Sequence, residues 1–175
     1  QIPAWYPGYR EMLEQERPDA VYIATTHNFH YENLLLCIEH RVPALCEKCL
    51  VLTAAQARDV FAKAREQDVF LTDAMWSRFL PGHRQAARWI EQGEIGEIRS
   101  AGYEIGFLAG EGHRVLDPAI GGGALYDIGV YAIEGLTGLI RQPLLRSSSL
   151  LRRSPEGVDL TAHLMLEFDE CIASI

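Results

Sequence analysis

The part of this sequence best equipped for chemistry is residues 121–131, which read GGGALYDIGVY. Three consecutive glycines have no Cβ atoms, so another backbone or a flat ligand can approach that loop closely. The residues after the glycines are predicted to form a helix, and the four-residue spacing of Asp127 and Tyr131 places both on one helix face. A carboxylate beside a phenol is an arrangement that can move a proton. The same pattern also fits a tight connection followed by a solvent-facing pair, and the spacing alone leaves both interpretations open.

A phenol needs assistance to act as a base near neutral pH, because its reference pKa is about 10. A neighbouring cation provides that assistance by favouring the charged form of the phenol. Lys48 is the candidate for this role, and its ammonium group could also anchor a ligand oxygen. The alternative interpretation of Lys48 is an ordinary solvated surface lysine.

Strand and helix patterns alternate over the first 74 residues, and these elements must position the candidate groups. Short apolar runs rich in β-forming residues predict buried strands, and apolar residues at helical spacing predict helices between them. Thr53 and Gln56 form a capping box at the start of one helix, and Asn28 is a candidate cap for another. The predicted order is a strand at 19–25, a helix at 30–40, a strand at 43–46, the helix after Thr53, and a strand at 68–73.

This order predicts a parallel sheet whose strands all end at one edge, where ligands bind in such folds. Three loops meet there (25–30, 47–49 and 74–78), and they bring together Lys48, Trp76, Arg78, His27 and His30. The two histidines have no evident third metal ligand, so polar loop or pocket-lining roles are favoured. Trp76 either packs as an apolar plate or stacks on a cofactor ring. Arg78 either pairs with a carboxylate or clamps a phosphate or substrate oxygen.

Beyond residue 74 the pattern changes from strand–helix alternation to paired strands. A helix is predicted after Pro81, a strand at 97–107, and an antiparallel hairpin of 144–153 and 159–168 around a turn at 154–157. The predicted fold class is therefore α/β, with a partial Rossmann-like parallel sheet followed by a partial α+β domain that has a mostly antiparallel open sheet. The expected domains are residues 1–74 and 75–175.

Charge and composition narrow the classes of function. The net charge is −8 and no basic cluster is longer than the pair Arg152 and Arg153, which argues against nucleic acid or an anionic membrane as a partner. No apolar run approaches the roughly 18–20 residues that span a bilayer. Four cysteines are too few for a disulfide framework in a chain of this length, so a cytoplasmic location is expected.

Cys46 and Cys49 form a C-x-x-C at a predicted strand end, which is the placement of a thioredoxin-like dithiol. A structural zinc site would need a second ligand pair at suitable spacing, and the sequence offers none. Two small buried side chains are the alternative. The sequence therefore leaves a thiol–disulfide function open as a lesser alternative.

Four ordered motifs make nearly the whole chain similar to a known family. They are DAVYIATTH at 19–27 with His30 following, EK at 47–48, DAMWSRFLP at 73–81 and GGGALYDIGVY at 121–131. Together they resemble the Gfo/Idh/MocA family of NAD(P)-dependent oxidoreductases. Many members have histidine where this chain has Tyr131. A tyrosine at this position is typical of the branch that contains the dihydrodiol and NADP-linked D-xylose dehydrogenases, so the chain resembles that branch.

The resemblance implies a dinucleotide-binding Rossmann domain at 1–74 and a substrate and dimerisation domain at 75–175, whose sheet would join a homodimer. It implies hydride transfer between a diol or sugar carbinol and nicotinamide, with NADP as the cofactor and NAD as the alternative. Tyr131 would be the acid/base, Lys48 would stabilise the alkoxide, and Asp127 would orient the pair. Trp76 and Arg78 would line the substrate pocket with Tyr131. The implied cofactor contacts are Thr25, Thr26, His27, His30, Glu47, Lys48, Trp76 and Arg78; no metal is expected.

Two departures from the family pattern bear on these roles. Cys49 stands where the family has proline after Glu-Lys. Only a bond to proline adopts the cis form at small cost, so this replacement bears on the direction in which the Lys48 side chain points. No G-x-G-x-x-G occurs, so the chain is expected to be a central fragment without the phosphate loop and the last strands. A non-catalytic fragment or interaction module is then the alternative to a dehydrogenase.

Overall fold

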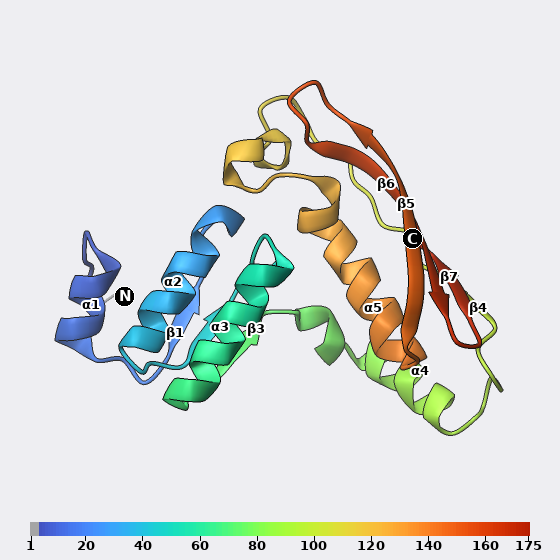
Figure 1. Ribbon diagram of the computed structural model, residues 1–175, viewed down its shortest axis with the longest axis horizontal. Helices are drawn as coiled ribbons and strands as arrows, with labels where there is room; N and C mark the ends of the chain where they lie inside the picture. The colour runs from blue at the N-terminus through green and yellow to red at the C-terminus, as the bar shows by residue number, and fades with distance from the viewer. Residues whose placement is uncertain (1–3) are drawn as a thin grey trace. The chain divides into compact units, whose positions relative to one another are not determined.

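The computed structural model describes residues 4–175. The chain divides into two compact units, Gln1–Ala74 and Met75–Ile175, and each has its own sheet. Figure 1 shows the helices and strands of both units. Within residues 4–175, no helix has both the length and the apolar character needed to cross a bilayer.

The first unit is built on a three-stranded parallel sheet. Its strands are β1 (Val21–Ile23), β2 (Ala44–Cys46) and β3 (Leu71–Asp73), and they are ordered in space as they are in sequence. Ile23 pairs with Cys46, and Cys46 pairs with Asp73, so the last residues of all three strands lie at one edge. The loops that follow β1 and β2 therefore start side by side.

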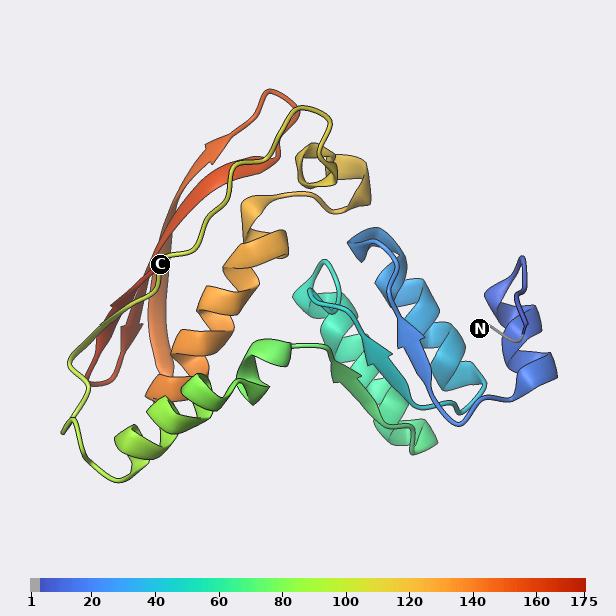
Figure 2. The same cartoon turned by 180° about the vertical axis from the view of Figure 1, so that it is seen from behind.

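Three helices accompany this sheet: α1 (Tyr9–Glu16), α2 (His27–Glu39) and α3 (Ala54–Gln67). Helices α2 and α3 lie on the same face of the sheet (Figures 1 and 2). Their buried side chains form one core with those of the strands. The members of that core are Ile23, Leu34, Cys37, Ile38, Ala44, Cys46, Val60 and Ala64. The predicted capping box of α3 is confirmed, because the Thr53 and Gln56 side chains each accept from the backbone N–H of the other residue.

Helix α2 begins earlier than the predicted residue 30, and Asn28 is not its cap. Thr26 is the extended residue before the helix, with φ −77° and ψ 158°. Asn28 lies inside the first turn, where its side-chain oxygen accepts a bond from the Thr26 hydroxyl at 2.7 Å. That acceptor is therefore engaged locally, and the helix extends over the histidines that the sequence had placed in a loop.

The second unit contains α4 (Pro81–Glu91), α5 (Val130–Ile140) and four short helical segments. Three of these segments are 3₁₀ turns: η1 (Trp76–Phe79), η2 (Arg114–Leu116) and η3 (Pro118–Ile120). The fourth, η4 (Leu125–Gly129), is a π-helical turn that leads directly into α5.

The sheet of the second unit has the order β4-β7-β6-β5. Strands β5 (Leu144–Arg153) and β6 (Asp159–Phe168) form the predicted antiparallel hairpin, and β7 (Ile172–Ser174) pairs antiparallel with β6. Strand β4 (Ser100–Gly102) pairs parallel with β7. The predicted strand at 97–107 was wrong in length, because its ladder with β7 covers only three residues. The predicted fold class, a parallel sheet followed by a mostly antiparallel open one, is confirmed.

Helix α5 covers one face of this sheet. Leu136 and Ile140 of the helix pack with Leu166, Phe168 and Ala173 of β6 and β7. The packing fixes α5 against the strands, and with it the orientation of the residues at its N-terminal end.

Candidate active site

The glycine loop is folded tightly back on the residues before it. The N–H of Gly122 donates to the Asp117 carbonyl at 2.9 Å, and the N–H of Gly123 donates to the Val115 carbonyl at 2.8 Å. A Cβ at position 122 would lie 2.5 Å from the carbonyl oxygens of both Asp117 and Val115. Backbone atoms cannot move aside easily, so this approach requires glycine. The close contact predicted for the glycines is thus with the chain's own backbone.

Asp127 lies in the π-helical turn and Tyr131 in the first turn of α5. The Asp127 side chain is buried, and its Oδ1 accepts a bond from Nη2 of Arg114 at 2.7 Å. A buried carboxylate is stable in its charged form only when a partner of this kind is present. Arg114 precedes the glycine loop, and no motif in the sequence had assigned it this function.

The phenol of Tyr131 is held by Trp76. Nε1 of Trp76 donates to the Tyr131 hydroxyl oxygen at 2.8 Å, and the two rings meet edge to face with centroids 5.6 Å apart. The tyrosine is half-buried, and 56% of the tryptophan surface is exposed. This donor fixes the direction of the phenol, and a donor in this position favours negative charge on the oxygen that it contacts.

A second link joins η1 to α5 beside the first. The Arg78 guanidinium pairs with the carboxylate of Glu134, which lies three residues after Tyr131 on α5. The Glu134 side chain is only 10% exposed, whereas that of Arg78 is 57% exposed. The structure therefore brings Trp76, Arg78 and Tyr131 together within the second unit. Pairing with a carboxylate was one of the two functions predicted for Arg78, and Glu134 is that carboxylate.

In the first unit, Lys48 is the second residue after the end of β2. It is half-buried, and its backbone N–H donates to Oε2 of Glu47 at 3.2 Å. The hydroxyl of Tyr22 donates to the same carboxylate group. The Lys48–Cys49 peptide bond is cis, although Cys49 replaces the proline of the related motif.

The His30 ring joins the loops that follow β1 and β2. It is fully buried, with Nδ1 2.8 Å from the Cys49 carbonyl oxygen and Nε2 3.0 Å from the Thr25 carbonyl oxygen. His27 is also buried, and its ring lies 5.7 Å from that of His30. Both histidines thus lie inside the first unit, where His30 holds the Lys48 loop. Within residues 4–175, no three His, Cys, Asp or Glu side chains are grouped so that they could hold a metal ion.

The four cysteines, including those of the C-x-x-C motif, are buried. Burial, together with a smaller contribution from the Glu47 charge, raises the pKa of the Cys46 thiol to about 12. Burial alone raises the pKa of Cys37 to about 11. Because only the thiolate is a nucleophile, this environment opposes a thiol–disulfide function.

We expect Cys46 in the folded chain to react with iodoacetamide roughly 10³-fold more slowly than in the unfolded chain at about pH 8, since a raised pKa lowers the thiolate fraction in that proportion. The rate should rise with pH, because the thiolate fraction grows until the pH reaches the folded-state pKa. Mass spectrometry of labelled peptides measures this rate. If the dithiol hypothesis is wrong, Cys49→Ser should leave turnover of the extended protein nearly unchanged. Rapid labelling of Cys46, or a Cys46–Cys49 disulfide formed by a mild oxidant, would revive the dithiol hypothesis.

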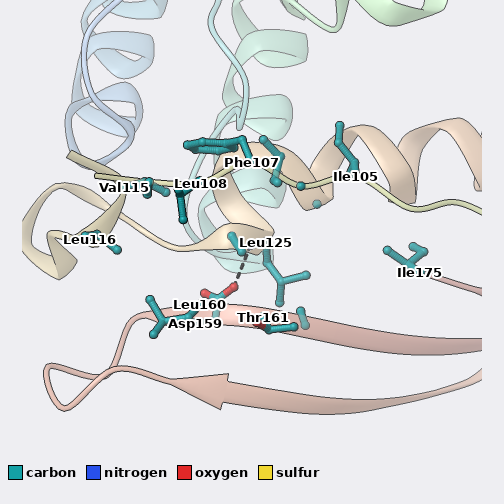
Figure 3. Close-up of a pocket in the computed structure, with 16 residues that line it drawn as sticks. Ile105, Phe107, Leu108, Val115, Leu116, Leu125, Asp159, Leu160, Thr161 and Ile175 are labelled. Atoms are coloured by element: carbon teal, nitrogen blue, oxygen red, sulfur yellow. Dashed lines mark hydrogen bonds between the residues drawn. The ribbon is translucent and has the colours of Figure 1, made fainter. Parts of the chain in front are cut away.

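A cavity of about 410 Å³ lies between η4, strand β6 and residues 105–109 (Figure 3). Its walls are mainly apolar, and Asp159 is the one charged residue among the described residues that line it. Asp127 and Tyr131 are not in the lining. Sequence patterns did not indicate this cavity, because its walls come from five separate segments of the chain.

Two protein-family models match the chain. The model described as an oxidoreductase family with an NAD-binding Rossmann fold matches residues 1–74, and the model of the GFO/IDH/MocA C-terminal domain matches residues 83–175. Among curated proteins, the mouse trans-1,2-dihydrobenzene-1,2-diol dehydrogenase is 36% identical over 168 residues, which are 95% of this chain and 50% of that protein. The chain therefore spans about half the length of the curated relatives it matches.

Solved structures are similar to this chain as well, and the chain again matches about half of each. A 3-ketoreductase from Actinomadura kijaniata, crystallised with NADP and TDP-benzene, is 32% identical with a TM-score of 0.82 and covers 95% of this chain and 53% of its own. A protein of gentamicin A biosynthesis, crystallised with NAD, is 26% identical with a TM-score of 0.82 and covers 97% of this chain and 50% of its own.

Proposed function

The chain belongs to the Gfo/Idh/MocA oxidoreductase family, and on this premise we propose that it forms the central part of a nicotinamide-dependent dehydrogenase. The substrate class is a diol or a sugar, and the reaction moves a hydride between a carbinol carbon and the nicotinamide, which is the chemistry that the bound nucleotide supplies. The observation that carries the proposal is the 2.8 Å bond from the Trp76 indole to the Tyr131 hydroxyl.

Tyr131 exchanges the proton of the substrate hydroxyl in this proposal. Its half-buried phenol oxygen accepts a bond from Trp76 Nε1, and that donor stabilises the oxygen while the proton is on the substrate. Asp127 lies about one helical turn before Tyr131, and Arg114 pairs with its carboxylate near the N-terminal end of α5. Asp127 thereby orients the segment and balances charge, and it takes no proton itself.

Lys48 supplies positive charge to the alkoxide that develops on the substrate, and it also contacts the nucleotide. The support for this role is its motif, its place at the carboxyl end of β2, and the buried His30 ring that holds the adjoining Cys49 carbonyl. A cation at such a position lowers the energy of an oxyanion in the transition state.

The first unit is proposed as the nucleotide-binding domain. Its parallel strands end together, which is where nucleotides bind in such sheets. Helix α2 starts there with Thr26 as its N-cap residue, whose side chain makes no capping hydrogen bond. The N-terminus of a helix suits a polar or anionic ligand group. Thr25, Thr26, Glu47 and Lys48 offer polar groups at this edge, while His27 and His30 support it from within. NADP is the proposed nucleotide and NAD the alternative, since relatives of both kinds exist.

The second unit is proposed as the substrate and dimerisation domain. Side chains alternate along β6, so Leu166 and Phe168 face α5 and Met165 faces the opposite way. By the strand register, Leu150 and Ile172 share the Met165 face, and all three side chains are at least half exposed. The same face carries the Arg146–Glu167 ion pair, and we propose this mixed surface as the one that meets a second copy of the chain in a homodimer.

The test of the proposed function is a fluorescence titration with NADPH, and with NADH in parallel. One sample is the chain of 175 residues, and the other is a version extended through its upstream reading frame. Binding by the extended version supports a dehydrogenase, and the tighter ligand identifies the nucleotide. If neither version binds either nucleotide, the non-catalytic interaction module becomes the better hypothesis.

A further inference from the structure

The segment that carries Asp127 and Tyr131 starts without a cap of its own. The first N–H groups of any helix lack partners within the helix, and a side-chain oxygen of the preceding residues usually accepts one of them. Here the preceding residues are glycines 121–123 and Ala124, whose side chains have no acceptor. No side-chain cap is made by Ala124 at the start of η4.

Asp159 supplies the missing acceptor from a distant part of the chain. Its Oδ2 accepts the backbone N–H of Leu125, the first residue of η4, at 2.7 Å (Figure 3). Asp159 is the first residue of β6, lies 34 positions further along the chain, and is only 9% exposed. A buried carboxylate at this end of a helix also interacts favourably with the helix dipole.

The glycine loop is shaped to admit this carboxylate. A Cβ at position 123 would lie 2.3 Å from Oδ1 of Asp159, and Gly123 has a φ of +131°. Any other residue type at 123 would therefore displace the carboxylate or strain the backbone. Gly123 and Asp159 are thus matched to each other across the loop and the sheet.

We propose that Asp159 is a positioning residue for the proton-transfer site. By holding the N–H of Leu125 against the first residue of β6, it sets the start of the η4–α5 segment. Tyr131 follows Leu125 by six residues in continuous helix, so a shift at the start moves the phenol relative to Trp76. The consequence for turnover rests on the proposed function, whereas the consequence for geometry does not.

The geometric test uses the chain of 175 residues and three variants. Asp159→Ala removes the acceptor, Asp159→Asn keeps an acceptor oxygen, and Asp169→Ala removes an exposed carboxylate just beyond the other end of β6. We expect Asp159→Ala to shift the Trp76 indole N–H resonance, assigned with a Trp76→Phe sample, and to speed amide exchange at Leu125 about tenfold, as the loss of one cap would. Asp159→Asn should restore most of both signals, and Asp169→Ala should change neither.

The kinetic test uses the extended protein. Asp159→Ala should lower kcat about tenfold with an unchanged KM for the nucleotide, and Asp159→Asn should recover most of that loss. An unmoved Trp76 resonance together with unchanged Leu125 exchange in Asp159→Ala overturns the positioning role. If Asp159→Ala does not fold, Asp159→Asn decides: native signals support the role, and displaced signals oppose it. If the geometric effect is present but the extended protein binds neither nucleotide, the proposed function fails and the Asp159 assignment stands. If Tyr131→Phe retains full turnover, only the acid/base role of Tyr131 fails.

Discussion

Replacing Tyr131 with phenylalanine should lower kcat of the extended protein by about 10²–10⁴-fold, the range that one general acid/base contributes. The variant removes only the hydroxyl that Trp76 Nε1 contacts, so the ring packing between η1 and α5 should persist. Nucleotide affinity should stay within about twofold, since the change removes a proton donor with almost no contact area. Steady-state kinetics with a diol and with a sugar substrate, beside a nucleotide titration, measure both quantities.

Tyr103→Phe is the matched control for that experiment. It also removes one phenolic hydroxyl from the second unit, at a residue whose ring packs against Gly135 of α5. Its kcat should equal that of the unaltered protein. Retained turnover in Tyr131→Phe would end the acid/base assignment, and an equal loss in both variants would point to a general effect of hydroxyl removal on the fold.

Replacing Lys48 with methionine should lower kcat/KM by about 10²–10³-fold, because removal of one fixed group that stabilises an oxyanion has an effect of this size. Methionine keeps an unbranched side chain of similar length, so the half-buried site after β2 stays filled. We also expect weaker nucleotide binding, since the proposal gives Lys48 a contact with the cofactor. The two effects are separated by measuring single-turnover hydride transfer at saturating nucleotide.

Lys63 is the only other lysine in the sequence and provides the control. It forms an i,i+4 ion pair with Asp59 on α3 at 2.5 Å, with 45% of its side chain exposed. Such exposed pairs contribute little stability, so Lys63→Met should retain full activity. Full activity in Lys48→Met would remove this residue from the mechanism and leave Tyr131 to act without a cationic partner.

Local patterns in the sequence were enough to predict much of the fold. The capping box of Thr53 and Gln56, the strand–helix alternation of the first unit and the long hairpin of the second all depend on residues close together in the chain. Hydrophobic periodicity and capping residues act over a few positions, which makes them readable without a structure. Prediction failed where an element depends on a partner that is distant in the sequence. The strand predicted at 97–107 contains only the three residues that pair with β7.

The family motifs likewise identified Lys48, Asp127 and Tyr131 as candidates, because residue type and order suffice for that. Their surroundings came only from the tertiary structure. The bond between Trp76 and Tyr131 joins residues 55 positions apart, and that between Leu125 and Asp159 spans 34 positions. Contacts of this kind have no period in the sequence, because they arise only when elements distant in the sequence have packed together. The sequence by itself thus determined which groups are available for chemistry and the local elements that carry them. Folding alone decided which donor reaches the Tyr131 phenol and which carboxylate caps its helix.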